Sequence, residues 1–84
     1  MDDDERVMMK AAEGVATEVL KTLGEQEQIL KFFAFEHLPE KLRDVSFAFA
    51  SLAIQVMDIP RSAERTVALR KILEGKDAAV RASL

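Results

Sequence analysis

The apolar residues of this chain recur at steps of three and four in three separate segments, and this spacing constrains the fold more than any other feature. Such a period places apolar side chains on one face of an α-helix. The segments are separated at Gly24, at Pro39 and at residues 58–61, which carry residue types that stop or start helices. The sequence therefore predicts an all-α fold, with an N-terminal helix followed by an antiparallel helical hairpin.

The first segment, residues 2–23, is predicted to form a helix that stops at Gly24. Acidic residues at its start suit the positive end of a helix dipole. Its apolar stripe is narrow and spaced like a coiled-coil seam, so this helix can pack on a second copy of the chain as readily as on its own. The stripe consists of Met8, Ala12, Val15, Val19 and Leu23.

The later segments predict a hairpin, because the link between them is short. One helix is expected from Glu40 to Met57, with Pro39 at its first turn, and the next is expected after Ser62 as N-cap. Residues 25–36 hold three of the five phenylalanines and fit a short helix or an extended segment equally well. The expected core of the hairpin is Leu42, Val45, Phe49, Leu52, Val56, Leu69, Ile72, Leu73 and Val80.

The chain is short and has no cysteine, and both features limit the stability of a monomer. A lone domain this short buries only about 60% of the surface that its unfolded chain exposes. Without cysteine, no disulfide can stabilise it. We therefore expect a small oligomerising bundle, a homo-oligomer. We expect one compact domain overall, with an acidic helix and connector in residues 1–31 and the helical hairpin in residues 32–84.

The N-terminus lacks the basic start and apolar core of a secretory signal, and no apolar run approaches the roughly 20 residues that span a bilayer. A cytoplasmic protein without membrane contact is expected. Residues 1–30 carry eight acidic and three basic side chains, whereas residues 61–84 carry three and six. A chain with this balance is a poor candidate for duplex nucleic acid, where affinity comes from many phosphate contacts, but its basic end can hold one small anion.

No catalytic signature is present. The sequence has no phosphate-binding loop, no dinucleotide-binding glycine fingerprint, no zinc-protease motif and no nucleophile elbow. His37 has no acid, serine or cysteine at motif spacing, and the acidic run at residues 2–4 lies at a terminus, where solvation is the usual state. We expect no catalytic residues, no metal site and no cofactor, and hence a protein that acts by binding.

A candidate anion site lies at the start of the last helix. Arg61, Ser62, Arg65 and Thr66 place two guanidinium groups and two hydroxyls where free N–H groups and the helix dipole already favour an anion. Further basic residues follow on the same helix, among them Arg70, Lys71, Lys76 and Arg81. The alternative interpretation is an ordinary solvated helix face with intrahelical ion pairs.

Three stretches carry a resemblance to a known group. They are Phe32-Phe33-Ala34-Phe35-Glu36-His37-Leu38-Pro39, the Val45–Ala53 stretch, and Glu64–Glu74 together with Lys76–Ala82. Over roughly residues 32–82 the chain resembles a widespread group of small bacteriophage proteins. More distantly it resembles the helical-hairpin domain of phage anti-defence nucleotide sponges, which counter CBASS and Thoeris immunity. The first 30 residues have no counterpart in this resemblance.

The resemblance implies a helical homo-oligomer that binds cyclic di- or trinucleotides, or a cyclic ADP-ribose-type signal, and hides them from host effectors without hydrolysis. The implied function is thus a non-enzymatic phage sponge in the cytoplasm of a host bacterium. The alternative function is a helical oligomerisation or protein-interaction module that binds a host or phage protein. The ligand-binding residues expected for the sponge are Arg65, Thr66, Arg70, Lys71, Arg61, His37 and Phe35.

Overall fold

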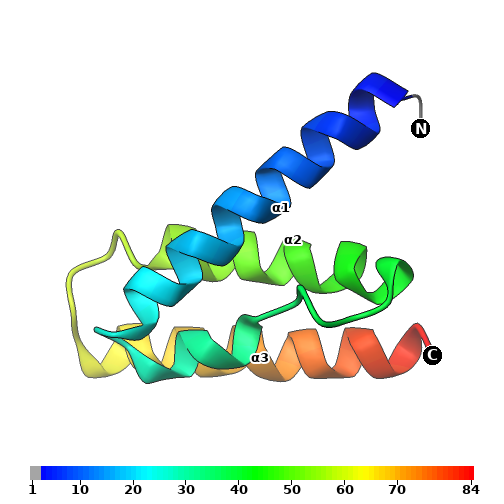
Figure 1. Cartoon of the computed structure of the whole chain (residues 1–84). Coiled ribbons are helices and arrows are strands. Elements are labelled where there is room, and N and C mark those ends of the chain that lie inside the picture. Colours follow the sequence, from blue (N-terminus) through cyan, green and yellow to red (C-terminus); the bar gives the residue numbers. More distant parts are fainter. Residues whose placement is uncertain (1–2) are drawn as a thin grey trace.

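The computed structural model describes residues 3–84, and Figure 1 shows that these residues form helices joined by short connections. No strand occurs within residues 3–84, so the predicted all-α fold class is confirmed. Met1 and Asp2, the predicted first residue of the N-terminal helix, lie outside the described residues. The elements are α1 (Asp3–Gly24), the 3₁₀-helix η1 (Gln28–Phe33), α2 (Glu40–Val56) and α3 (Ala63–Ala82).

The hairpin expected from the short link is confirmed, since α2 and α3 run side by side in opposite directions (Figure 1). Ser62 caps α3 as predicted: its backbone is extended, and its side chain accepts a hydrogen bond from the backbone N–H of Arg65 at 3.1 Å. Pro39 sits one residue before α2, as its N-cap. None of the helices within residues 3–84 is long and apolar enough to cross a membrane.

Residues 25–36, which fitted a short helix or an extended segment equally well, contain both. η1 covers their middle, and residues 34–39 then lead to α2 without regular structure. η1 contacts α1, α2 and α3, so it forms the centre of the packing. Two of its large side chains, Leu30 and Phe33, are almost completely buried, as is Phe35 just after it. The boundary expected between residues 31 and 32 falls inside this element.

The expected apolar face of α2 was wrong by one position. Its buried residues are Ser46, Ala50 and Ala53, whereas Leu52 is 46% exposed. The large side chains from η1 and residue 35 fill the core, and small residues on α2 leave the space that they occupy. Among the other residues expected in the hairpin core, Leu69 is fully buried, and the rest are half-buried, namely Leu42, Val45, Phe49, Val56, Ile72, Leu73 and Val80.

The buried residues of α1 all lie in its C-terminal half. Its buried residues are Ala16, Leu20 and Gly24, and Figure 1 shows the N-terminal half projecting beyond the hairpin. At Gly24 an added Cβ would lie 3.1 Å from Cγ of Lys31, so a larger residue there would require the Lys31 side chain to shift. The predicted seam of α1 is thus largely uncovered within the chain.

The two neighbouring phenylalanines of η1 provide a test of the core. Phe33 is 0% exposed and Phe32 is 66% exposed. We expect Phe33→Ala to lower the free energy of unfolding by about 3–5 kcal/mol, through lost burial and a residual cavity. Phe32→Ala, the matched control, should change it by about 0.5 kcal/mol or less. Urea unfolding followed by circular dichroism measures both, and equal midpoints would mean that η1 packs through a different face.

Candidate ligand site

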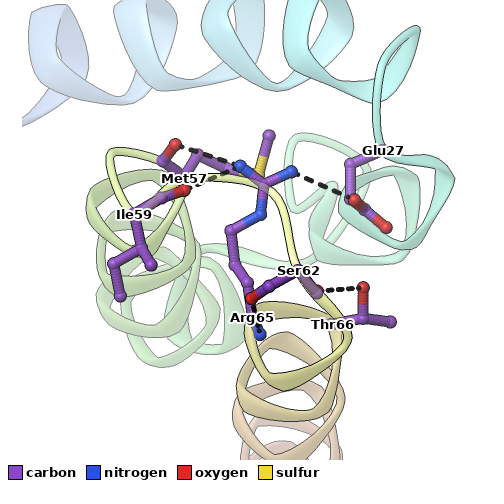
Figure 2. Close-up of polar contacts among 6 residues, drawn as sticks. All are labelled: Glu27, Met57, Ile59, Ser62, Arg65 and Thr66. Atoms are coloured by element: carbon purple, nitrogen blue, oxygen red, sulfur yellow. Dashed lines mark hydrogen bonds and ion pairs between the residues drawn. The ribbon is translucent and has the colours of Figure 1, made fainter.

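Arg65, the central residue of the expected anion site, is turned into the protein (Figure 2). Its side chain is 8% exposed and its guanidinium has partners from two other segments. Nη1 donates hydrogen bonds to the backbone carbonyls of Ile59 at 2.9 Å and Met57 at 3.4 Å. Nη2 forms an ion pair with Oε2 of Glu27 at 3.3 Å.

These partners explain why a charged side chain is buried here. The carbonyls of Met57 and Ile59 lie just beyond the end of α2, where backbone acceptors lack helical partners and a positive charge is favourable. Glu27, whose side chain is 14% exposed, supplies the opposite charge from the connection between α1 and η1. Arg65 therefore joins three segments of the chain.

We expected Arg65 to be an exposed phosphate contact, and the expected exposure was wrong. Its guanidinium is already occupied by protein groups. A sequence signal for this burial existed, because Arg65 precedes Leu69 and Ile72 at helical steps of four and three, on the apolar line of the helix.

Four other expected contacts are Arg61, which lies just before α3, and Thr66, Arg70 and Lys71 in the first half of α3. Arg61 and Arg70 are exposed, and Thr66 donates its hydroxyl to the backbone carbonyl of Ser62 at 3.3 Å. The ammonium of Lys71 pairs with Glu74 at 3.5 Å, and this pair is exposed. These contacts are those of a solvated helix face, the alternative that the sequence left open.

Phe35 and His37 lie elsewhere. Phe35 is 1% exposed and packs edge-to-face on Phe47, with ring centroids 5.5 Å apart. His37 is exposed and faces the C-terminal half of α3. It shares a groove with Arg81, which lies about 16 Å along the helix from Arg70 at 1.5 Å per residue. The structure therefore does not bring the seven expected residues together.

A basic groove instead lies between residues 31–38 and the C-terminal half of α3. Its volume is about 410 Å³. Arg43 holds one wall in place, since its Nη1 donates to the backbone carbonyl of Leu38 at 2.9 Å while its Nε lies 4.0 Å from Glu13 on α1. The groove is lined by Lys31, Phe32, Ala34, His37, Leu38, Lys76, Asp77, Val80 and Arg81.

The groove combines cations with an exposed aromatic ring. Lys31, Lys76 and Arg81 outnumber the single acid, Asp77, and the ring of Phe32 is 66% exposed beside them. The ammonium of Lys76 lies 2.8 Å from Oδ1 of Asp77, and only 14% of the Lys76 side chain is exposed. A partly buried cation interacts more strongly with an anion than a fully solvated one.

Lys31 and Phe32 were missed by sequence reasoning, and Lys76 and Arg81 were noted only as neighbours of the outward helix face. The signal for Lys76 was its position, since it follows Leu69 and Ile72 on the apolar line of α3. Its nearness to Phe32 depends on η1 packing against α3, which no spacing in the sequence encodes.

A second cavity, also of about 410 Å³, lies between α1 and residues 25–36. Leu20, Leu30 and Phe35 supply its apolar wall. The charged groups at its edge balance in sign, with two lysines and two glutamates: Lys21, Lys31, Glu25 and Glu36. This cavity therefore favours an anion less than the basic groove does.

Across residues 3–84, no group of three or more His, Cys, Asp or Glu residues is arranged to hold a metal ion.

In comparisons with known proteins, no family model, no curated protein and no solved structure matches the chain.

Two arginines of α3, Arg65 and Arg70, allow a structural role to be distinguished from a surface role. We expect Arg65→Ala to lower the free energy of unfolding by at least about 2 kcal/mol, because it removes charge-assisted hydrogen bonds and leaves the Glu27 carboxylate without its partner. Arg70→Ala, on the exposed side of the same helix, should change it by about 0.5 kcal/mol or less. Chemical denaturation of the two variants tests this. Two equal, small effects would contradict the role of Arg65 as a link between segments.

Proposed function

We propose that this chain is a non-enzymatic protein that binds and sequesters a nucleotide signal, of the cyclic di- or trinucleotide or cyclic ADP-ribose type, in a bacterial cytoplasm. This is the activity implied by the resemblance to phage anti-defence nucleotide sponges. The observation that carries the proposal is the basic groove, which is lined by three cations and an exposed aromatic ring on a chain whose net charge is -3.

The chemistry of the groove suits both parts of a nucleotide. Ammonium and guanidinium groups bind phosphate oxygens through charge-assisted hydrogen bonds, and the guanidinium of Arg81 can make two at once. Aromatic faces stack on nucleobases with little dependence on the base. Phe32 supplies such a face at the edge of the groove, and Lys31 and His37 lie on the same wall.

The resembling stretches also support this location. Residues 32–39 and residues 76–82, which carry two parts of the likeness, lie on opposite walls of the basic groove. The outward face of α3 stays as a second possible position for the phosphates, through Arg61, Thr66, Arg70 and Lys71. We prefer the groove because it adds an apolar wall to its cations.

Binding can be measured by thermal shift and calorimetry against a panel of cyclic nucleotides. A ligand that binds only the folded chain at 100 times its Kd stabilises it by about 2.7 kcal/mol, which raises the Tm of a domain this small by about 10 °C or more. We expect Arg81→Ala and Lys31→Ala each to weaken binding about tenfold or more, because each removes a charge-assisted hydrogen bond.

Arg70→Ala is the matched control for this measurement, an exposed arginine on the same helix but away from the groove. Its Kd should equal that of the unmodified chain. A loss of affinity in Arg70→Ala with none in Arg81→Ala would place the ligand on the outward face of α3. No Tm shift with any cyclic nucleotide would refute the proposed function and favour the protein-interaction alternative.

Sequestration also predicts the fate of the ligand. After long incubation with excess protein and heat denaturation of the complex, the nucleotide should be recovered chemically intact, as judged by chromatography and mass spectrometry. A His37→Ala variant run in parallel identifies any contribution of the one imidazole in the chain. Recovery of a linearised or hydrolysed product, abolished in His37→Ala, would show that the protein is an enzyme.

A further inference from the structure

α1 carries an apolar face that the rest of the chain does not cover. Met8 is 71% exposed and Val15 is 64% exposed, and the residues between them on the same face, Ala11 and Ala12, are exposed as well. The buried residues of α1, which pack on the rest of the chain, are Ala16, Leu20 and Gly24. At 100° per residue, the centres of these two sets lie about 130° apart around the helix. We call Met8, Ala11, Ala12 and Val15 the α1 face.

The molecule exposes more surface than a compact chain of its mass. Its accessible surface is 5668 Å², against about 5,000 Å² expected for a compact monomer of this size. Its radius of gyration is 13.0 Å, against about 12 Å expected for this length. The excess area is close to the roughly 800 Å² that each partner buries in a standard protein interface. The projecting half of α1 accounts for this shape (Figure 1).

We propose that the α1 face pairs with the same face of a second copy of this chain, with the two α1 helices antiparallel. The steps of three and four that join Met8, Ala12 and Val15 are those of a helix seam. The two alanines at its centre let the helix axes approach closely, because axis separation depends on side-chain size at the contact. A symmetric contact of this kind is self-complementary and closes as a dimer.

The charges on α1 favour the antiparallel orientation. The first turn holds three acids, Asp3, Asp4 and Glu5, and the last turn holds Lys21. A parallel pair brings two acidic first turns together and aligns the helix dipoles unfavourably. In an antiparallel pair each acidic first turn lies beside the C-terminal part of the partner's α1. There Lys21 lies 3.6 Å from Glu18 and offsets the charge of that glutamate. With the alanines at the centre, Met8 of one copy lies against Val15 of the other.

The first experiment measures mass by light scattering at tens of micromolar without nucleotide. We expect a mass of at least twice 9.4 kDa for the unmodified chain and a shift to 9.4 kDa for Val15→Asp, with helical circular dichroism retained. Val7→Asp is the matched control, since Val7 is 67% exposed on the same helix but outside the α1 face. It should keep the mass of the unmodified chain.

Three outcomes would overturn this proposal: an unmodified chain of 9.4 kDa, a Val15→Asp variant of unchanged mass, or equal dissociation by Val7→Asp. The first outcome would leave the α1 face for a different protein. The result is independent of ligand binding, because a dimer that binds no nucleotide supports the α1 contact while the proposed function fails.

The orientation is tested by cross-linking, which is clean because the chain has no cysteine. Met8→Cys and Val15→Cys chains are mixed and oxidised gently. The antiparallel pair brings the two different positions within disulfide reach, so mixed disulfides should exceed like-with-like products, as counted by mass spectrometry. An excess of Met8→Cys chains linked to each other would show a parallel pair and refute the orientation.

Discussion

The guanidinium of Arg65 is the contact on which the arrangement of the chain depends. A buried charge is stable only where it is paired and hydrogen-bonded, and Arg65 has a carboxylate at 3.3 Å and a carbonyl at 2.9 Å. These partners belong to the connection before η1 and to the turn after α2. The Nε of Arg65 has no hydrogen-bond partner within residues 3–84. Because α3 holds Arg65 in its first turn, the start of η1 is fixed beside the start of α3. Residues 34–39 must then pass the far end of α3, where the basic groove lies.

Features encoded by neighbours in the sequence were predictable. The period of apolar residues gave the three long helices to within about a residue, and Ser62 marked the start of α3 because an N-cap is a local hydrogen bond. The conformation of residues 25–36 was not predictable in this way. η1 is stabilised by burial against three helices at once, and a short 3₁₀ segment has little stability of its own. The packed face of α2 followed from η1, so it could not be assigned before η1 was placed.

For the candidate site, too, the sequence predicted features that depend on neighbouring residues but not those that depend on tertiary packing. Residue types and spacing correctly identified α3 as the basic element, but Arg65 and Arg70 are equally basic, and only the fold shows that one is buried and the other exposed. Lys31 and Lys76 are far apart in the sequence, so the groove that they share could not be derived from spacing. The resemblance had marked residues 32–39 and 76–82 without indicating that they face each other.

Arg65 and Lys76 lie on the same apolar line of α3 but have different partners. This difference assigns Arg65 to folding and leaves Lys76 for the proposed binding role. Arg65 has partners that come from distant segments, so its charge is committed to holding the chain together. Lys76 has the carboxylate of its sequence neighbour Asp77, which is 48% exposed and needs no tertiary contact to reach it. An anion that enters the groove can replace or join this local pair without disturbing the core. Substitutions at the start of α3 therefore affect stability, whereas substitutions at its far end can alter the proposed binding groove with less effect on stability.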